Sequence, residues 1–319
     1  MRHTQYLKEG FRFQKFAAGT VDDAVFTREF DDSTWKEIAI PHDWGVEGDF
    51  SADNDLSYCN VVQDGILAKI SHTGRTGGLP TVGEGVYRRW VHLDEFETAF
   101  LECDGIMWES RIYVNGTLAG GCHFGYLSFE VDITSLAVPG ENLIAIHALV
   151  PPASGRWYSG AGLYRNLRLL TKPRAHITYN GVWVRQAYAN ATSALFDISV
   201  DAVGACGFTA RITDPKGESV ELSTEDNLLS YLIEDPMLWD VDSPSLYTVT
   251  VTIPGGDAVT VRFAPRLAEF TKDGFFLNGR YLKMRGVCMH HDLGMLGAAV
   301  NRDALLRQIE ILKSMGVNA

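Results

Sequence analysis

The chain has 319 residues, 46% of them hydrophobic and 11% aromatic, which is enough to build packed cores in two domains. Lys and Arg number 28 against 40 Asp and Glu, so the net charge of −12 would repel a phosphate backbone. Nucleic acid is therefore not expected as a partner. No window approaches the roughly 18 consecutive apolar residues of a membrane span, so a membrane is not expected as a partner either.

The first residues, MRHTQYLKEGFRF, contain no apolar core of a secretion signal. The protein is therefore expected in the cytoplasm, or outside it (secreted or periplasmic) if a signal peptide has been removed. Its five cysteines are odd in number, scattered and without CxxC spacing, so neither a disulfide framework nor a zinc site is predicted. We interpret them as reduced and mostly buried thiols.

From about residue 12 to residue 170, short alternating segments separated by turn residues predict a β-rich domain. Asn115 and Gly116 lie between two such segments and predict a tight hairpin, because both central turn positions need positive φ. Short strands with turns about every 8 to 12 residues are typical of a sandwich or jelly roll. The expected strands include residues 86–93, 110–114, 117–121, 128–133 and 143–149.

A second β-rich segment follows Pro173, and it shows no helical periodicity over about 90 residues. The sequence DPKG at residues 214–217 predicts a turn within it. This length and pattern favour an immunoglobulin-like sandwich. The expected strands include residues 181–188, 194–203, 207–212, 219–222 and 246–253.

The pattern changes after Phe270. Residues 275–277 and 281–284 flank Asn278–Gly279 and predict another hairpin, which residues 285–289 are expected to continue as a strand.

Apolar residues then recur at helical spacing over residues 305–315, with Asn301 as the predicted N-cap and Gly316 just past the helix end. Residues 317–319 predict the start of another strand. A strand, a helix and a strand in this order open a βα repeat.

The stretch RGVCMHHDLG, residues 285–294, places two adjacent histidines before an aspartate. Side chains alternate in an extended segment, so His290 and Asp292 are expected on one side and His291 on the other. Adjacent histidines are poor co-ligands for one ion, and no metal site is predicted in this chain. His290 and Asp292 could instead bind the hydroxyls of a polar ligand, with the carboxylate fixing the imidazole tautomer. The alternative is that they are loop residues bonded to nearby backbone.

Two other stretches are candidates for a site. In RWYSGAGLYR, residues 156–165, Arg156 and Trp157 combine a cation with an aromatic ring, as proteins do when they stack on a sugar and hold its hydroxyls. The alternative is a strand that packs its aromatics into the first domain. PHDW, residues 41–44, is interpreted as a turn beside a buried Trp44, the alternative being a functional His–Asp pair.

Taken in order along nearly the whole chain, several stretches resemble glycoside hydrolase family 2, the family of β-galactosidases, β-glucuronidases and β-mannosidases. They are DDSTWKEIAIPHDW, GVYRRW, IYVNGTLAG, GYLSFEVDIT, PGENLIAI, SGAGLYRNLRLL, PMLWDVDSPSLYTVTV and FFLNGRYLKMRGVCMHHDLGMLGAAV.

The resemblance implies a mostly β fold: a jelly-roll sugar-binding domain at residues 1–172, an immunoglobulin-like β-sandwich at residues 173–266, and the incomplete start of a TIM-barrel catalytic domain at residues 267–319. By its position in RGVCMHH, His290 is implied to reach the sugar. Arg156 and Trp157 are implied by a family loop that lends a polar residue to the same pocket, although the aspartate often found there is missing here.

Family members hydrolyse terminal β-linked sugars with retention, using an acid glutamate and a nucleophilic glutamate about 5 Å apart. The acid lies in an Asn-Glu motif, and this chain contains no Asn-Glu pair. The resemblance therefore implies the N-terminal part of an enzyme that cleaves terminal β-galactosides, without catalytic residues of its own and inactive alone. An incomplete barrel should also leave an apolar face of the residue 305–315 helix unburied.

Two alternatives stay open: a β-glucuronidase parent, and a non-catalytic carbohydrate-binding module. The expected partner is a carbohydrate, a β-galactoside, and a homo-oligomer is left open. No cofactor is expected in this chain, while family members often bind Mg²⁺ or Na⁺ near the site of the complete enzyme.

Overall fold

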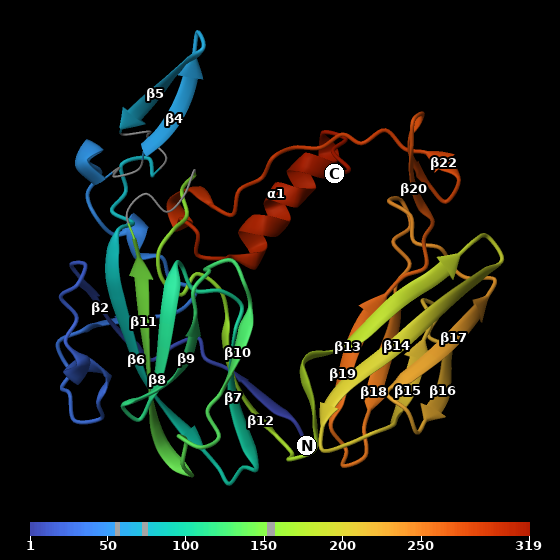
Figure 1. Cartoon of the computed structure of the whole chain (residues 1–319), viewed down its shortest axis with the longest axis horizontal. Coiled ribbons are helices and arrows are strands. Elements are labelled where there is room, and N and C mark those ends of the chain that lie inside the picture. The colour runs from blue at the N-terminus through green and yellow to red at the C-terminus, as the bar shows by residue number, and fades with distance from the viewer. Residues whose placement is uncertain (55–57, 72–75, 152–156) are drawn as a thin grey trace. The chain divides into compact units, whose positions relative to one another are not determined.

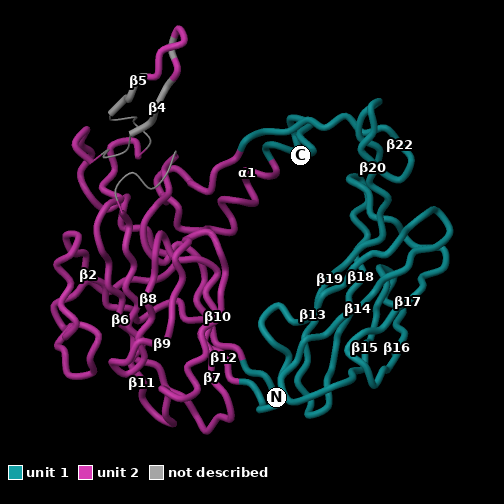
Figure 2. Tube along the Cα trace, viewed as in Figure 1, with its two compact units in different colours: residues 1–3, 172–288, 311–319 teal, residues 4–171, 289–310 magenta. Residues whose placement is uncertain are grey.

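The computed structural model describes residues 1–54, 58–71, 76–151 and 157–319. These residues form two compact units (Figure 2). Unit 1 comprises residues 1–3, 172–288 and 311–319, and unit 2 comprises residues 4–171 and 289–310. Each unit is therefore assembled from separate stretches of the chain. The three domain boundaries expected from the sequence stay predictions.

Unit 2 is a β-sandwich built from two sheets (Figure 1). Alternate residues of its strands are buried, as in Glu109–Val114, where Ser110, Ile112 and Val114 face inward. Side chains from both sheets share one hydrophobic core, which includes Phe11, Leu101 and Ile146. One sheet has the order β3-β2-β6-β11-β8-β9, and the other has the order β1-β12-β7-β10. The strands are β1 His3–Tyr6, β2 Phe11–Phe16, β3 Lys36–Ile38, β6 Gly83–Leu93, β7 Thr98–Cys103, β8 Glu109–Val114, β9 Thr117–Cys122, β10 Phe129–Asp132, β11 Gly140–Val150 and β12 Leu167–Lys172.

Short elements complete this unit. The 3₁₀ helices are η1 Asp23–Phe26, η2 Trp44–Val46, η3 Ala52–Asn54 and η4 Gly294–Leu296. Strands β4 Tyr58–Gln63 and β5 Ile66–Ser71 pair with each other in a two-stranded sheet. The hairpin predicted at Asn115–Gly116 is confirmed, because β8 and β9 pair across it and the two residues have φ values of 51° and 89°.

Unit 1 contains a second β-sandwich, made of a three-stranded sheet of order β13-β14-β17 and a four-stranded sheet of order β16-β15-β18-β19. Phe196 and Ile198 from one sheet and Val249 and Val251 from the other share its core. The DPKG turn is confirmed, because the amide of Gly217 donates to the carbonyl oxygen of Asp214 at 3.1 Å. A mostly β fold with an immunoglobulin-like sandwich is thus confirmed. The strands are β13 His176–Ala189, β14 Ser193–Val203, β15 Phe208–Thr213, β16 Ser219–Thr224, β17 Leu228–Glu234, β18 Tyr247–Thr252 and β19 Ala258–Phe263.

A small sheet and a helix follow the second sandwich. The sheet is formed by β20 Ala268–Thr271, β21 Gly274–Leu277 and β22 Arg280–Tyr281, and the helix is α1 Arg302–Ser314. The predicted helix caps are confirmed: Asn301 Oδ1 accepts from the Ala304 amide at 3.0 Å, and Gly316 has φ of 83°. The Gly316 amide donates to Lys313 and the Val317 amide to Leu312, the pattern of a Schellman motif.

The strand predicted at residues 285–289 is wrong, since this segment has no regular strand conformation. The backbone carbonyl of Arg285 accepts from the Asn318 amide at 3.0 Å, and the Val287 amide donates to Ala319 at 3.3 Å. Both bonds advance in the same direction along the two segments, as between parallel strands. Two bonds are too few for a ladder, which is why no regular strand forms.

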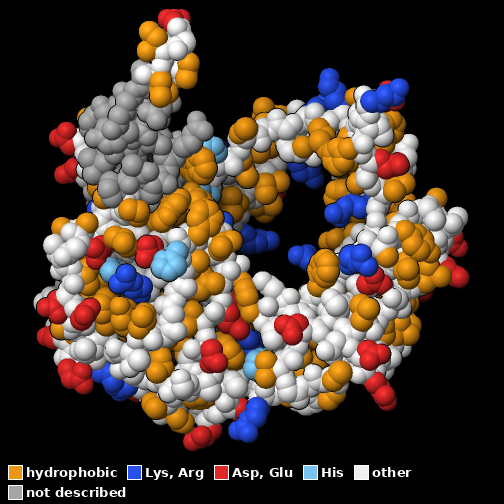
Figure 3. All heavy atoms as spheres, viewed as in Figure 1, with side chains coloured by type: hydrophobic (Ala, Val, Ile, Leu, Met, Phe, Trp, Pro, Cys, Tyr) orange, Lys and Arg blue, Asp and Glu red, His pale blue; other side chains and the backbone are white. Residues whose placement is uncertain are grey.

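Helix α1 keeps an apolar face exposed, as predicted. None of its residues is buried, and Leu306, Ile309 and Ile311 are each more than two-fifths exposed. Figure 3 shows hydrophobic side chains gathered over this helix. Within the described part of the chain, no helix combines the length and the apolar character that crossing a membrane requires.

Candidate functional site

Trp157 and His290 come together in unit 2, although 133 positions separate them in the sequence (290 − 157). Their ring centroids are 5.0 Å apart, with an angle of 60° between the ring planes. Trp157 Nε1 donates a hydrogen bond to the hydroxyl of Tyr126 at 3.0 Å, and the Trp157 side chain stays 39% exposed. The indole is thus fixed by its nitrogen while part of its surface remains accessible.

Within unit 2, His291 connects the histidine segment to Ser159 and Tyr126. Its Nε2 donates to the backbone carbonyl oxygen of Ser159 at 2.8 Å, and its ring packs edge-on against Tyr126 at 5.3 Å. His290 and Asp292 on either side of it are exposed, whereas His291 is half-buried. The opposite orientations expected from the sequence agree with these exposures. His291 is therefore the structural member of the pair, and His290 and Asp292 face solvent.

Aromatic rings surround Tyr126. Trp108 lies 5.6 Å and Phe124 lies 5.4 Å from it, centroid to centroid. Burial raises the pKa of the Tyr126 hydroxyl, so this group stays protonated and able to hydrogen-bond over the physiological range. The result is an aromatic cluster next to the two exposed polar side chains of the histidine segment.

Asp43, also in unit 2, is a carboxylate with only 2% of its surface exposed. Its Oδ1 accepts from the amides of Gly45 at 2.8 Å and Ala161 at 2.9 Å. Its Oδ2 accepts from the Tyr158 hydroxyl at 2.7 Å and from the Ala298 amide at 2.8 Å. Burial, followed by the charge of Asp43, raises the pKa of Tyr158, so the phenol remains a donor. The desolvation of the carboxylate is thereby compensated on both oxygens.

His42 and Asp43 do not form a functional pair. His42 Nδ1 lies 2.8 Å from the hydroxyl of Tyr87 and its Nε2 lies 3.0 Å from Oε1 of Glu47, so it faces other partners than Asp43. Burial lowers the pKa of His42 despite the neighbouring Glu47. The turn beside a buried Trp44, which is 1% exposed, is the correct interpretation of PHDW.

Of the four predicted site residues, the structure brings Trp157 and His290 into contact and places Asp292 two residues further along. Arg156 lies outside the described residues. The alternative for residues 156–165 holds in part. Tyr164 is fully buried in unit 2, as that alternative expected, but Trp157 to Arg165 form no strand beyond an isolated bridge between Gly162 and Met107. Tyr126 and Asp43 were missed by sequence reasoning, and only the PHDW motif gave a signal for one of them.

The expectation for the cysteines has an outcome. Of the cysteines with described side chains, Cys103 is buried, Cys122 is half-buried, and Cys206 and Cys288 are exposed, so the expectation of mostly buried thiols is wrong. All four are free. Within the described ranges, no group of three or more His, Cys, Asp or Glu side chains is placed to hold a metal ion.

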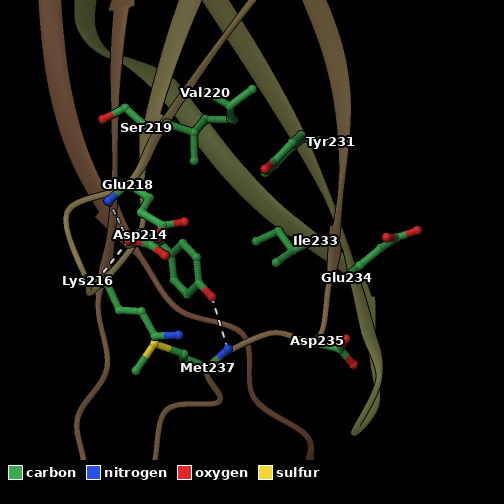
Figure 4. Close-up of a pocket in the computed structure, with 12 residues that line it drawn as sticks. Asp214, Lys216, Glu218, Ser219, Val220, Tyr231, Ile233, Glu234, Asp235 and Met237 are labelled. Carbon is green, nitrogen blue, oxygen red and sulfur yellow. Dashed lines mark hydrogen bonds between the residues drawn. The ribbon is translucent and has the colours of Figure 1, made fainter.

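A separate pocket of about 350 Å³ opens at one end of the sandwich in unit 1 (Figure 4). Two of its polar side chains have structural partners: Asp214 accepts from the amides of Lys216 and Glu218, and the Tyr247 hydroxyl accepts from the Met237 amide at 3.0 Å. Because none of the predicted site residues lines it, we do not assign the site to this pocket.

The architecture has clear relatives among known proteins. Residues 175–264 match the family model described as glycosyl hydrolases family 2. The chain is 32% identical to the β-galactosidase BoGH2A of Bacteroides ovatus, over 91% of this chain and 35% of that protein. It is 28% identical to a putative β-glucuronidase of Formosa agariphila, over 93% of this chain and 29% of that protein. The chain thus spans about a third of the length of these curated relatives.

Solved structures agree. A β-glycosidase from Bacteroides vulgatus superposes with a TM-score of 0.85 at 29% identity, covering 99% of this chain and 41% of that one. A family 2 member from Bacteroides cellulosilyticus superposes with a TM-score of 0.83 at 28% identity, covering 99% and 42%. These likenesses relate the chain to the glycoside hydrolases. Over nearly its whole length it resembles members of glycoside hydrolase family 2, and residues 175–264 match the model of that family.

Proposed function

We propose that this chain supplies sugar-orienting residues to a family 2 glycosidase that hydrolyses terminal β-linked sugars, with β-galactosides as the substrate class. The observation that carries the proposal is the contact between Trp157 and His290, whose ring centroids are 5.0 Å apart, beside the exposed carboxylate of Asp292. A partly exposed aromatic face flanked by hydrogen-bonding groups suits a sugar ring, which presents both apolar C–H surface and hydroxyls.

In this proposal each group has a distinct role. Trp157 packs against the C–H surface of the sugar, and its orientation is set by the hydrogen bond to Tyr126. His290 offers one donor and one acceptor when neutral, and Asp292 offers acceptors only, so together they match hydroxyl groups. Holding the sugar in one orientation lowers the entropic cost of the later chemistry. The acid and nucleophile of retaining hydrolysis are proposed to lie outside this chain.

Charge supports a galactoside over a glucuronide. Carboxylates are ionised at neutral pH, and Asp292 lies exposed beside His290. A glucuronide would bring its own carboxylate close to that charge, and the like charges would repel. A galactoside is neutral and can donate its hydroxyls to Asp292. The relatives named β-galactosidase and β-glucuronidase leave both substrates represented in the family.

The test is a titration of the purified chain with methyl β-galactoside and methyl β-glucuronide, followed by NMR of the indole and imidazole resonances. We expect weak saturable binding of the galactoside, since a site with few anchors gains little over the cost of association. Trp157→Ala and His290→Ala should abolish it. Trp183→Ala is the matched control, because Trp183 is 64% exposed on β13 of unit 1 and should leave binding unchanged.

The alternative function, a binding module with no hydrolytic parent, is separated by a second experiment. The chain alone should not turn over a chromogenic β-galactoside in a sample whose intact mass is confirmed. His290→Ala in a complete parent enzyme should lower kcat/KM for the galactoside. Turnover by the chain at its stated mass would contradict the assignment of the catalytic pair elsewhere, and unchanged kcat/KM would contradict the role of His290.

A further inference from the structure

Asp43 joins two stretches of chain that carry the proposed sugar-binding residues: residues 157–165, which include Trp157, and residues 289–310, which include His290. Its carboxylate accepts from Tyr158, the neighbour of Trp157, and from Ala298, which lies in the same segment of unit 2 as His290. We propose that Asp43 is a positioning residue, which sets where Trp157 and His290 stand relative to each other without touching the sugar itself. This inference rests on the proposed function.

The chemistry of the anchor requires a carboxylate. All four partners of Asp43 are donors: the amides of Gly45, Ala161 and Ala298 and the Tyr158 hydroxyl. An asparagine would present an NH₂ group on one side, and a backbone amide cannot rotate to accept from it. At least one buried amide would then lose its acceptor, which costs more than a surface hydrogen bond would.

The backbone is shaped to approach this carboxylate closely. Gly160 and Gly297 both have positive φ, at 71° and 58°. A Cβ atom at these positions would lie 2.8 Å and 2.4 Å from Oδ2 of Asp43, inside the contact limit of real side chains. Glycine is needed at both places, because only a residue without Cβ combines that backbone conformation with such an approach. The two stretches are therefore built around Asp43.

Among the described residues, two further hydrogen bonds link the same two stretches: His291 donates to the Ser159 carbonyl oxygen, and the Val300 amide donates to the Tyr164 carbonyl oxygen at 2.9 Å. Loss of Asp43 would leave these two links and the ring contacts around Tyr126, but no side-chain acceptor for the Ala298 amide. We therefore expect the two stretches to shift apart locally while the sandwich stays folded, because Asp43 is not one of the residues that form the hydrophobic core of unit 2.

The experiment compares Asp43→Asn with the unsubstituted chain by NMR and hydrogen exchange. We expect displaced resonances for the Trp157 indole and for both imidazoles, exchange of the Ala298 amide faster by on the order of tenfold, and loss of galactoside binding. Asp257→Asn is the matched control. Asp257 is likewise a buried carboxylate, bonded to Arg2 and Ile177, but it lies in unit 1. It should destabilise unit 1 and leave the Trp157 and His290 resonances in place.

Gly297→Ala tests the contact between the Asp43 carboxylate and the 289–310 segment by a change in that segment. It replaces Asp43→Asn as the test if Asp43→Asn does not fold. Its Cβ should push the Asp43 carboxylate away and reproduce the displaced Trp157 and His290 resonances. The proposal is overturned if neither variant moves these resonances, or if Asp257→Asn moves them equally. A chain that binds no galactoside but shows the resonance shifts would contradict the proposed function and leave the positioning role of Asp43 standing.

Discussion

His291 donates a hydrogen bond from Nε2 to the backbone carbonyl oxygen of Ser159 across 2.8 Å, while its neighbour His290 lies against Trp157. The two adjacent histidines thus have different roles: His291 bonds the backbone of Ser159, whereas His290 is exposed beside Trp157. The division gives a direct experimental contrast.

His291→Phe should lower the stability of unit 2 by about 1–2 kcal/mol, because the ring packing is kept while the carbonyl of Ser159, a residue only 6% exposed, loses its donor. His290→Phe should leave stability nearly unchanged and abolish galactoside binding. Thermal unfolding and the sugar titration together check this pair. Equal destabilisation by both substitutions would contradict the division of tasks.

His42 should make unit 2 less stable in mild acid. Burial lowers the pKa of the folded-state imidazole below its ordinary value of 6.5, so the unfolded chain takes up the proton first. Stability contributed by the neutral ring is therefore present above pH 6.5 and is lost as the pH falls toward the folded-state pKa, at no more than about 1.4 kcal/mol per pH unit. Below that pKa the loss from this group stops.

Thermal unfolding measured between neutral pH and about pH 5 checks the slope, because most carboxylates titrate lower. His42→Gln should flatten the profile in this window. His123→Gln, at a side chain that is 90% exposed, is the control and should not. A profile that keeps its slope in His42→Gln would assign the acid sensitivity to another group.

Arg2→Ala should destabilise unit 1 by about 3 kcal/mol, since it leaves the fully buried carboxylate of Asp257 without its cation. Arg2 bonds both oxygens of Asp257, at 3.1 Å and 2.9 Å. Arg302→Ala is the comparison, because its pair with Asp303 is 3.9 Å long and both side chains are almost fully exposed. Denaturant unfolding, fitted with separate transitions for the two units, should detect the first and not the second.

The cysteines should react at different rates with a thiol reagent. Cys206 and Cys288 are exposed and should be modified in the folded protein, whereas burial raises the pKa of the Cys103 thiol and keeps it from reacting. Mass spectrometry of peptides, taken at intervals, identifies each site. Cys103 should be labelled only after denaturant is added, and early labelling would show that the core around it opens readily.

Local signals in the sequence predicted local structure well. Asn301 and Gly316 determine the ends of α1 through bonds to residues at most five positions away, so the caps could be recognised from the sequence. The prediction of a strand at residues 285–289 failed because a strand is defined by its partners. Among the residues that the structure describes, residues 318–319 alone make backbone hydrogen bonds with this segment. The mostly β fold followed from alternation, since alternate residues in strands such as β14 are buried.

The candidate site was predicted in part. Trp157 and His290 were chosen for their chemistry, and the structure brings them together. The role of Asp43 could not be seen, because its partners Tyr158, Ala161 and Ala298 lie 115, 118 and 255 positions away. A buried carboxylate is recognised only when the donors that compensate its desolvation are known.

The ion pair between Arg2 and Asp257 also has a practical meaning for anyone who wishes to express the second sandwich separately. A protein made of residues 172–288 alone would lack the cation that neutralises Asp257, because that cation is Arg2, which lies far before residue 172 in the sequence. The isolated product would carry an unpaired charge in its interior and would need it removed by substitution, or the first three residues joined to it through a linker. Cutting the chain at residues 172 and 288, where the second sandwich begins and ends, would therefore not give a self-sufficient domain.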